Sequence, residues 1–83
     1  MPPAKILVVD DEEIVLLSCE RVLSEEGYEL RTLLSGREAL PLLGEETFDL
    51  AIVDLKMPGI GGIELLRAFK SGWPDMSVIM ITG

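Results

Sequence analysis

The chain has 83 residues, 48% of them hydrophobic, and carries 15 acidic against 7 basic side chains, a net charge of −8. That length suits one small domain. The acidic excess argues against direct contact with nucleic acid, because phosphates attract Lys and Arg. The apolar runs are far shorter than the ~20 residues of a membrane span. The single cysteine excludes an internal disulfide and fits a reducing, cytoplasmic setting, while the absence of histidine excludes a histidine base or a histidine metal ligand.

The first part of the sequence predicts a strand, a helix and a second strand. Residues 5–10 are a short apolar run rich in β-branched side chains, which favours a buried strand. Residues 12–26 predict a helix, and Gly27 is placed to end it in the left-handed conformation. Residues 28–33 are more polar, which predicts a strand at an edge of the sheet. The predicted core stripe of the helix comprises Val15, Ser18, Cys19 and Val22, with Leu16 and Leu17 adding apolar surface beyond it.

The next segment predicts a second helix, a third strand and a loop. Residues 35–38, with the sequence Ser-Gly-Arg-Glu, have the spacing of a capping box and open the helix. Pro41 lies near its start, where proline is tolerated, so we expect this helix to be short or distorted. Residues 48–54 predict the third strand, and residues 55–61, built on Met-Pro-Gly, predict a loop.

The last part predicts a third helix and a fourth strand. The helix is expected at 62–70, with Ile63, Leu66 and Phe69 on one side, and the strand is expected at 76–81. Strand and helix therefore alternate three times, which predicts a parallel sheet with helices on both faces. Right-handed crossover connections restrict such a sheet to a few strand orders.

Polar side chains stand where three of the apolar runs stop. Asp10 and Asp11 follow the first run, Asp54 ends the third and Thr82 follows the fourth. Because the carboxyl ends of parallel strands meet at one edge of a sheet, we expect these side chains to gather at a ligand-binding edge. Crowded carboxylates repel one another unless a cation joins them. The pattern predicts a hard-metal site, with Mg²⁺ as the ion, and a nucleophilic or phosphate-handling role.

Simpler interpretations of the individual residues stay open. An acidic residue after a strand often caps the following helix, and Asp11 taken alone fits that role equally well. A threonine at the end of a strand is commonplace, so Thr82 carries little weight by itself. Lys56 taken alone is typical of a solvated loop residue, and Cys19 of a small buried hydrophobe.

Taken together, the motifs resemble the receiver domain of two-component response regulators. The resemblance rests on residues 5–12 and 48–59, supported by residues 36–40 and 78–83, and it covers the whole chain. It implies a flavodoxin-like (CheY-like) parallel sheet with strand order 2-1-3-4 and helices on both faces. It also implies a phosphorylatable signalling module that is not a turnover enzyme.

The resemblance also implies a role for each site residue. Asp54 resembles the phosphoacceptor, and Asp10 and Asp11 resemble the acidic pair that organises Mg²⁺. Asp11 and Asp54 would bind the metal directly and Asp10 through water. Lys56 would offer its backbone carbonyl to the metal, and Thr82 would contact the phosphoryl group. The phosphoryl donor would be a phosphohistidine on a histidine kinase or phosphotransfer protein, or a small acyl-type phosphate.

The chain departs from the family pattern at its end. Receivers continue through a fourth helix, a fifth strand and a fifth helix, whereas this sequence stops at Gly83, so we expect residues 1–83 to be the N-terminal portion of one receiver domain. The lysine that pairs with the phosphoryl oxygens would then be missing, and we expect Mg²⁺ binding with poor phosphorylation. Residues 76–81 would become an apolar edge strand, which predicts a homodimer through that strand.

Two other functions are alternatives to this one. An aspartyl-nucleophile phosphatase of the haloacid-dehalogenase type has a second Asp two residues after the nucleophile, and Lys56 stands at that position. A degenerate receiver, acting only as a binding or dimerisation module, would fit the missing lysine. The intact acidic set argues against that second alternative.

Overall fold

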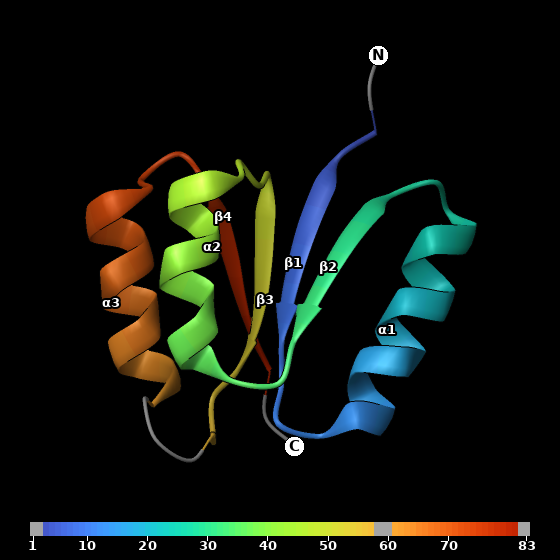
Figure 1. Ribbon diagram of the computed structural model, residues 1–83, viewed down its shortest axis with the longest axis horizontal. Coiled ribbons are helices and arrows are strands. Elements are labelled where there is room, and N and C mark those ends of the chain that lie inside the picture. The colour runs from blue at the N-terminus through green and yellow to red at the C-terminus, as the bar shows by residue number, and fades with distance from the viewer. Residues whose placement is uncertain (1–2, 58–60, 82–83) are drawn as a thin grey trace.

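Four short strands pair in parallel in the computed structural model, which describes residues 3–57 and 61–81. The strand order is β2-β1-β3-β4, as the resemblance implied. In the register, Val9 pairs with Leu33 on one side and with Val53 on the other, so the strands end at a common edge (Figure 1). The strands are β1 (Lys5–Val9), β2 (Glu29–Leu33), β3 (Leu50–Asp54) and β4 (Ser77–Ile81).

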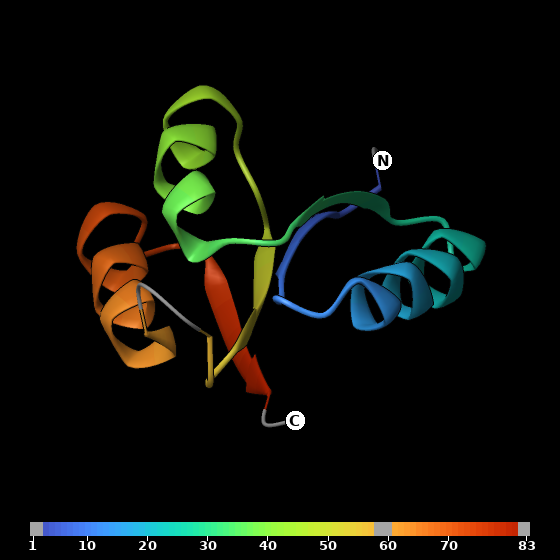
Figure 2. The ribbon, with the colours of Figure 1, turned by 60° about the horizontal axis from the view of Figure 1, so that its bottom comes forward.

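Helices cover both faces of the sheet. One helix packs on one face and the other two pack on the opposite face (Figure 2). Among the residues that the structure describes, no helix has both the length and the apolar character needed to cross a membrane. The helices are α1 (Glu13–Glu25), α2 (Ala39–Glu45) and α3 (Gly62–Gly72), and a 3-10 turn, η1 (Gly36–Glu38), leads into α2.

The core has two layers because successive strand residues point to opposite faces. Leu7 and Val9 of β1 pack with α2 and α3 in the larger layer. Ile6 and Val8 of the same strand pack with α1 in the smaller layer. The larger layer therefore anchors β3 and α3, the two elements that flank the loop after Asp54.

α1 packs through a different stripe from the predicted one. Leu16 is buried, with Cys19 and Leu23 partly buried beside it. Ser18 is exposed and Val22 is 59% exposed, so the predicted stripe is wrong at both positions. The helix carries apolar residues on two sides, and the sequence period alone could not choose the side that meets the sheet.

α1 ends as predicted at Gly27, which has φ of +90°. The N–H of Gly27 donates to the Ser24 carbonyl at 3.0 Å, and the N–H of Tyr28 donates to the Leu23 carbonyl at 3.2 Å. This pair of bonds is the Schellman motif, and its left-handed residue favours glycine. The motif turns the chain directly into β2.

α2 is short, as Pro41 predicted. Ser35 accepts a hydrogen bond from the Arg37 N–H at 3.2 Å and thereby caps η1, and α2 then covers only 7 residues with Pro41 in its first turn. The capping residue is the predicted one, although it opens a 3-10 turn first. This arrangement fits the tolerance of proline near a helix start.

α3 contacts the core mainly through Leu65 and Phe69, which are both fully buried. Ile63, expected on the core side, is 48% exposed, and Leu66 is only partly buried. The two buried residues are four apart and share one helix face with Gly62. The close approach at Gly62 sets the rotation of the helix, which apolar spacing did not reveal.

Candidate functional site

Asp10 and Asp54 lie at the carboxyl ends of adjacent strands. Val9 pairs with Val53 in the sheet, so the next residue on each chain segment reaches the same edge. Both carboxylates are nearly buried, with exposed fractions of 3% for Asp10 and 5% for Asp54. Burying an ionised carboxylate is costly unless hydrogen bonds or an opposite charge compensate, so this pair marks the edge as a candidate site.

Each buried carboxylate accepts a hydrogen bond from a backbone N–H further along the chain. The Glu12 N–H donates to Oδ1 of Asp10 at 2.9 Å, and the Lys56 N–H donates to Oδ1 of Asp54 at 3.0 Å. These are Asx turns, in which an aspartate side chain bonds to the backbone two residues on. The turns orient both carboxylates and direct the chain out of the sheet.

Three consecutive acidic residues bring their carboxylates together. Oxygens of Asp10, Asp11 and Glu12 lie within 4.8 Å of one another, a spacing that can hold a metal ion. Asp10 is buried, whereas Asp11 and Glu12 are exposed. Sequence reasoning missed Glu12, although its place next to the acidic pair was a visible signal. Asp54 was expected to belong to this group, but its carboxylate oxygens do not lie within 4.8 Å of all the others.

Asp10 and Asp54 nevertheless interact electrostatically. Burial raises the pKa of Asp10 above its ordinary value, the Glu12 N–H opposes that shift, and the negative charges of Asp54 and Asp11 raise the pKa further. The net direction is upward. Burial is the largest cause of this rise, and the neighbouring carboxylates add to it.

Lys56 and Thr82 complete the set of residues predicted from the sequence. The Lys56 side chain is exposed, and its backbone lies in the turn that holds Asp54. Thr82 lies outside the described residues, as do Pro58 and Gly59 of the predicted loop. Ile81, the last described residue of β4, pairs with Asp54.

Gly62 lets α3 approach the end of β3 more closely than any other residue would. A Cβ at this position would lie 2.7 Å from the Asp54 carbonyl oxygen and 2.7 Å from the Leu55 Cα. The Met80 side chain would also be 2.9 Å away. Sequence reasoning did not identify Gly62, because two adjacent glycines after a turn cluster are ordinary loop chemistry. The residue helps to fix the segment that carries Asp54.

The parallel sheet with an acidic edge is the architecture of a receiver domain, and comparison with known proteins supports this class. Residues 6–83 match the response regulator receiver domain. The chain belongs to that family. It is 38% identical over 80 residues to the response regulator MprA of Mycolicibacterium vanbaalenii, an alignment that covers 96% of this chain and 35% of the relative. The chain thus spans about a third of the length of such curated relatives.

Solved structures agree in fold. A CheY-like receiver domain protein from Methanospirillum hungatei has a TM-score of 0.94 and 38% identity, covering 98% of this chain and 65% of that one. The response regulator TrrA from Thermotoga maritima, solved with Mg²⁺ and BeF, has a TM-score of 0.90 and 39% identity, covering 95% of this chain and 69% of that one. TrrA has also been solved in complex with the histidine kinase ThkA, with a TM-score of 0.90, 39% identity and coverage of 96% and 69%.

Proposed function

We propose that Asp54 of this receiver domain accepts a phosphoryl group from a phosphohistidine on a separate histidine kinase or phosphotransfer protein. The observation that carries the proposal is the environment of Asp54, a nearly buried carboxylate oriented by the Lys56 N–H beside the acidic Asp10. The complex of TrrA with the kinase ThkA supports a kinase as the partner class. The chain would then be a signalling module that assists its own phosphorylation and dephosphorylation.

The transfer itself requires little covalent chemistry from the protein. A carboxylate oxygen of Asp54 attacks phosphorus in line, the bond from phosphorus to the donor nitrogen breaks, and the electron pair leaves with the imidazole. The product is an acyl phosphate, which water can later hydrolyse to restore the carboxylate. Such transfers depend mainly on positioning and charge neutralisation. The Asx turn at Asp54 supplies positioning, because it fixes one oxygen and so orients the other.

The donor set fits Mg²⁺. Carboxylate oxygens are hard ligands; those of Asp10 and Asp11 already lie within 4.8 Å of each other, and Asp54 lies at the end of the adjacent strand. We assign Asp11 and Asp54 as direct ligands and Asp10 as a ligand through water. The backbone carbonyl of Lys56 would be a further ligand. When bound, Mg²⁺ would neutralise charge on the carboxylates and on the transferring phosphoryl group.

Thr82 is the proposed contact to the phosphoryl group, and the composition bears on the partners and the cellular setting. Thr82 would donate its hydroxyl to a phosphoryl oxygen and change position on activation. The net charge of −8 favours protein partners and argues against nucleic-acid contact by this segment. A reducing cytoplasmic setting fits the single cysteine.

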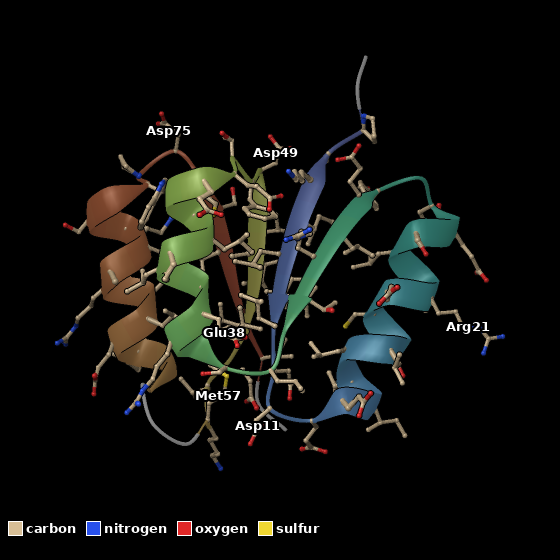
Figure 3. All side chains as sticks on the ribbon, viewed as in Figure 1. Asp11, Arg21, Glu38, Asp49, Met57 and Asp75 are labelled. Carbon is tan, nitrogen blue, oxygen red and sulfur yellow. The ribbon has the colours of Figure 1, made fainter. Side chains whose placement is uncertain are left out.

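Mass spectrometry after incubation with acetyl phosphate and Mg²⁺ tests the phosphoacceptor. We expect a fraction of the native chains to gain one phosphoryl group, in line with the poor phosphorylation expected from the sequence, and Asp54→Asn to gain none. Asp75→Asn is the matched control, since Asp75 is exposed and lies at the opposite end of the sheet from Asp11 (Figure 3). Equal gain in the native and Asp54→Asn chains would refute the assignment.

We also propose that two copies of this chain pair through β4. Among the described residues, β4 is the outermost strand of one sheet edge, and its sequence Ser-Val-Ile-Met-Ile carries no charge. Ile79 in its centre is 49% exposed. An apolar strand without charge or proline is a template for pairing with another chain.

A further inference from the structure

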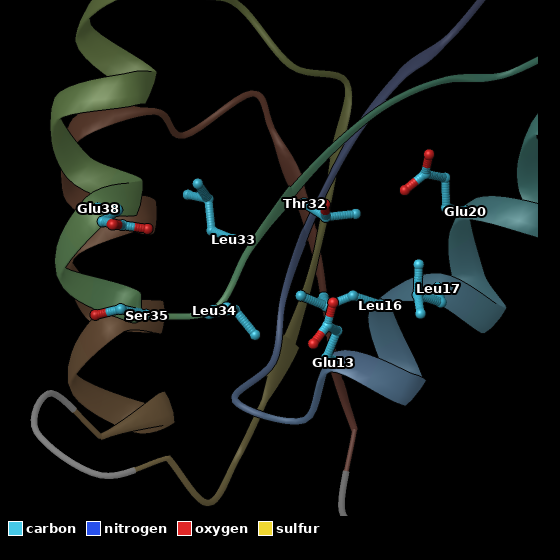
Figure 4. A pocket seen from close by; sticks show the side chains of 9 residues that line it. All are labelled: Glu13, Leu16, Leu17, Glu20, Thr32, Leu33, Leu34, Ser35 and Glu38. Carbon is cyan, nitrogen blue, oxygen red and sulfur yellow. The ribbon is translucent and has the colours of Figure 1, made fainter.

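A groove of about 310 Å³ separates α1 from the carboxyl-terminal end of β2 (Figure 4). Its apolar part includes Leu16 and Leu17 of α1, with Leu34 facing them from the end of β2. Leu16 is buried, whereas Leu17 is 58% and Leu34 is 52% exposed. Two half-exposed leucines on opposite walls of one groove are unlike the single exposed apolar residues that are ordinary on protein surfaces.

The rim of this groove is acidic. Glu13 and Glu20 come from α1, and Glu38 comes from η1 on the other side (Figure 4). All three are exposed, and none of the described residues that line the groove is basic. An apolar floor with a negative rim is complementary to a segment that carries an apolar side chain between positive ones.

The groove adjoins the acidic edge through the backbone. The Asp10 N–H donates to the Leu33 carbonyl at 3.1 Å, and Leu33 is also a groove residue. Glu13 follows directly after the acidic residues Asp10, Asp11 and Glu12. A molecule seated in the groove would therefore lie beside the candidate site without occupying it.

We propose that this groove docks a short segment of a partner protein that presents leucine-like side chains flanked by Arg or Lys. A second copy of this chain is a poor occupant of this groove, because its net charge of −8 would face an acidic rim, unlike the uncharged strand β4 through which we propose that two copies pair. Nucleic acid is opposed by the same charge. The proposal does not depend on phosphorylation of Asp54, since it rests on the shape and charge of a separate surface.

Two short peptides test the proposal by amide chemical shifts in NMR spectra. The probe is Arg-Leu-Ala-Leu-Arg and its control is Glu-Leu-Ala-Leu-Glu, both with blocked ends, in buffer without Mg²⁺ or phosphoryl donor. We expect the basic peptide to shift the amides of Leu17, Glu20 and Leu34, and we expect the acidic peptide to shift none of them. Binding should weaken between about 0.05 M and about 0.5 M salt, because salt screens rim charges.

Matched variants on α1 distinguish the contribution of the groove residues to peptide binding from that of the rest of the helix. Leu17→Asn should weaken binding by about fivefold or more because an apolar contact is lost. Val22→Asn, at a position that is 59% exposed outside the groove, should leave binding unchanged. Glu20→Gln should weaken binding by about two- to fivefold, as expected for a surface ion pair. Glu25→Gln, also on α1 but outside the groove, should have no effect.

Several results would overturn the proposal. One is equal binding of the acidic and basic peptides. A second is equal weakening by the groove variants and by their controls. A third is a shift of the groove amides with protein concentration alone, which would assign the groove to a second copy of the chain. Because no phosphoryl donor is present, none of these outcomes bears on the phosphoacceptor.

Discussion

The charge of Asp10 depends on the fold. Burial and the charges of Asp54 and Asp11 raise its pKa, so its ionised form is less favourable in the folded chain than in the unfolded chain. The folded chain then binds this proton more readily than the unfolded chain does. The free energy of unfolding therefore falls as the pH rises from the ordinary aspartate pKa through the raised one. At neutral pH the charge of Asp10 costs stability.

Asp10→Asn should therefore increase the free energy of unfolding at neutral pH in metal-free buffer. Asparagine keeps an oxygen that can accept the Glu12 N–H, while the buried charge is removed. The gain should shrink as the pH falls below the ordinary aspartate pKa, because Asp10 is then protonated in both states. Urea unfolding at several pH values measures the effect, with Asp75→Asn as an exposed control. A loss of stability at neutral pH would contradict this account.

The sequence identified the individual acidic residues well but not all of their neighbours. Asp10 and Asp54 could be predicted to share one edge of the sheet, because a strand end is visible in a sequence as the point where an apolar run stops. The structure places both residues, nearly buried, at that edge. Glu12 was missed because an acidic residue next to a helix start has an ordinary role in helix capping. Gly62 was missed because its importance comes from a close approach of α3 to the Asp54 and Leu55 backbone, which the sequence of a turn does not reveal.

At the scale of elements, α3 is held against β3 by the close approach at Gly62. Gly62→Ala should lower the free energy of unfolding by about 1–3 kcal/mol, the cost of overpacking, since its Cβ would meet backbone atoms that cannot move aside. Gly44→Ala is the matched helical control, because a Cβ there meets nothing within 4 Å.

Chemical denaturation of both variants measures the contrast. Gly44→Ala should gain about 0.5–1 kcal/mol, because alanine loses less conformational freedom than glycine in a helix. A Gly62→Ala chain as stable as the native one would show that α3 can shift away from β3 without cost.

Helix faces were the least predictable feature at this scale. Both α1 and α3 were expected from the sequence, yet Val22 and Ile63 proved exposed where a core role was predicted. On α1, apolar residues on two sides left the choice of stripe open. On α3, the glycine contact selects the face that carries Leu65 and Phe69. Tertiary contacts, which periodicity does not encode, made both choices.

The strand order of the whole sheet was predictable from the sequence. Alternating strands and helices with right-handed crossovers leave few arrangements, and the family resemblance selected the order β2-β1-β3-β4. The two edges of this sheet differ in character. β2 carries Glu29 and Arg31, whereas β4 carries no charged residue. Charge protects an edge strand from pairing with another chain, and β4 lacks that protection.

Ile79→Lys should therefore reduce self-association of the chain. A lysine in the centre of β4 would place a charge on the apolar surface that we propose pairs two copies. Light scattering at micromolar concentration compares the native chain, expected to be dimeric, with the variant, expected to be monomeric. Ile14→Lys is the control, because Ile14 is 70% exposed on α1, which lies beside β2 at the other edge of the sheet (Figure 1). A monodisperse native monomer would contradict the pairing.

The side chain that acetyl phosphate modifies decides whether Asp54 is the phosphoacceptor. After treatment with acetyl phosphate and Mg²⁺, borohydride reduces an aspartyl phosphate to homoserine, and peptide sequencing by mass spectrometry then locates the altered residue. We predict homoserine at position 54 and unaltered aspartate at positions 10 and 11. Modification at Asp10 or Asp11, with Asp54 intact, would contradict the proposed role of the carboxylate at the end of β3.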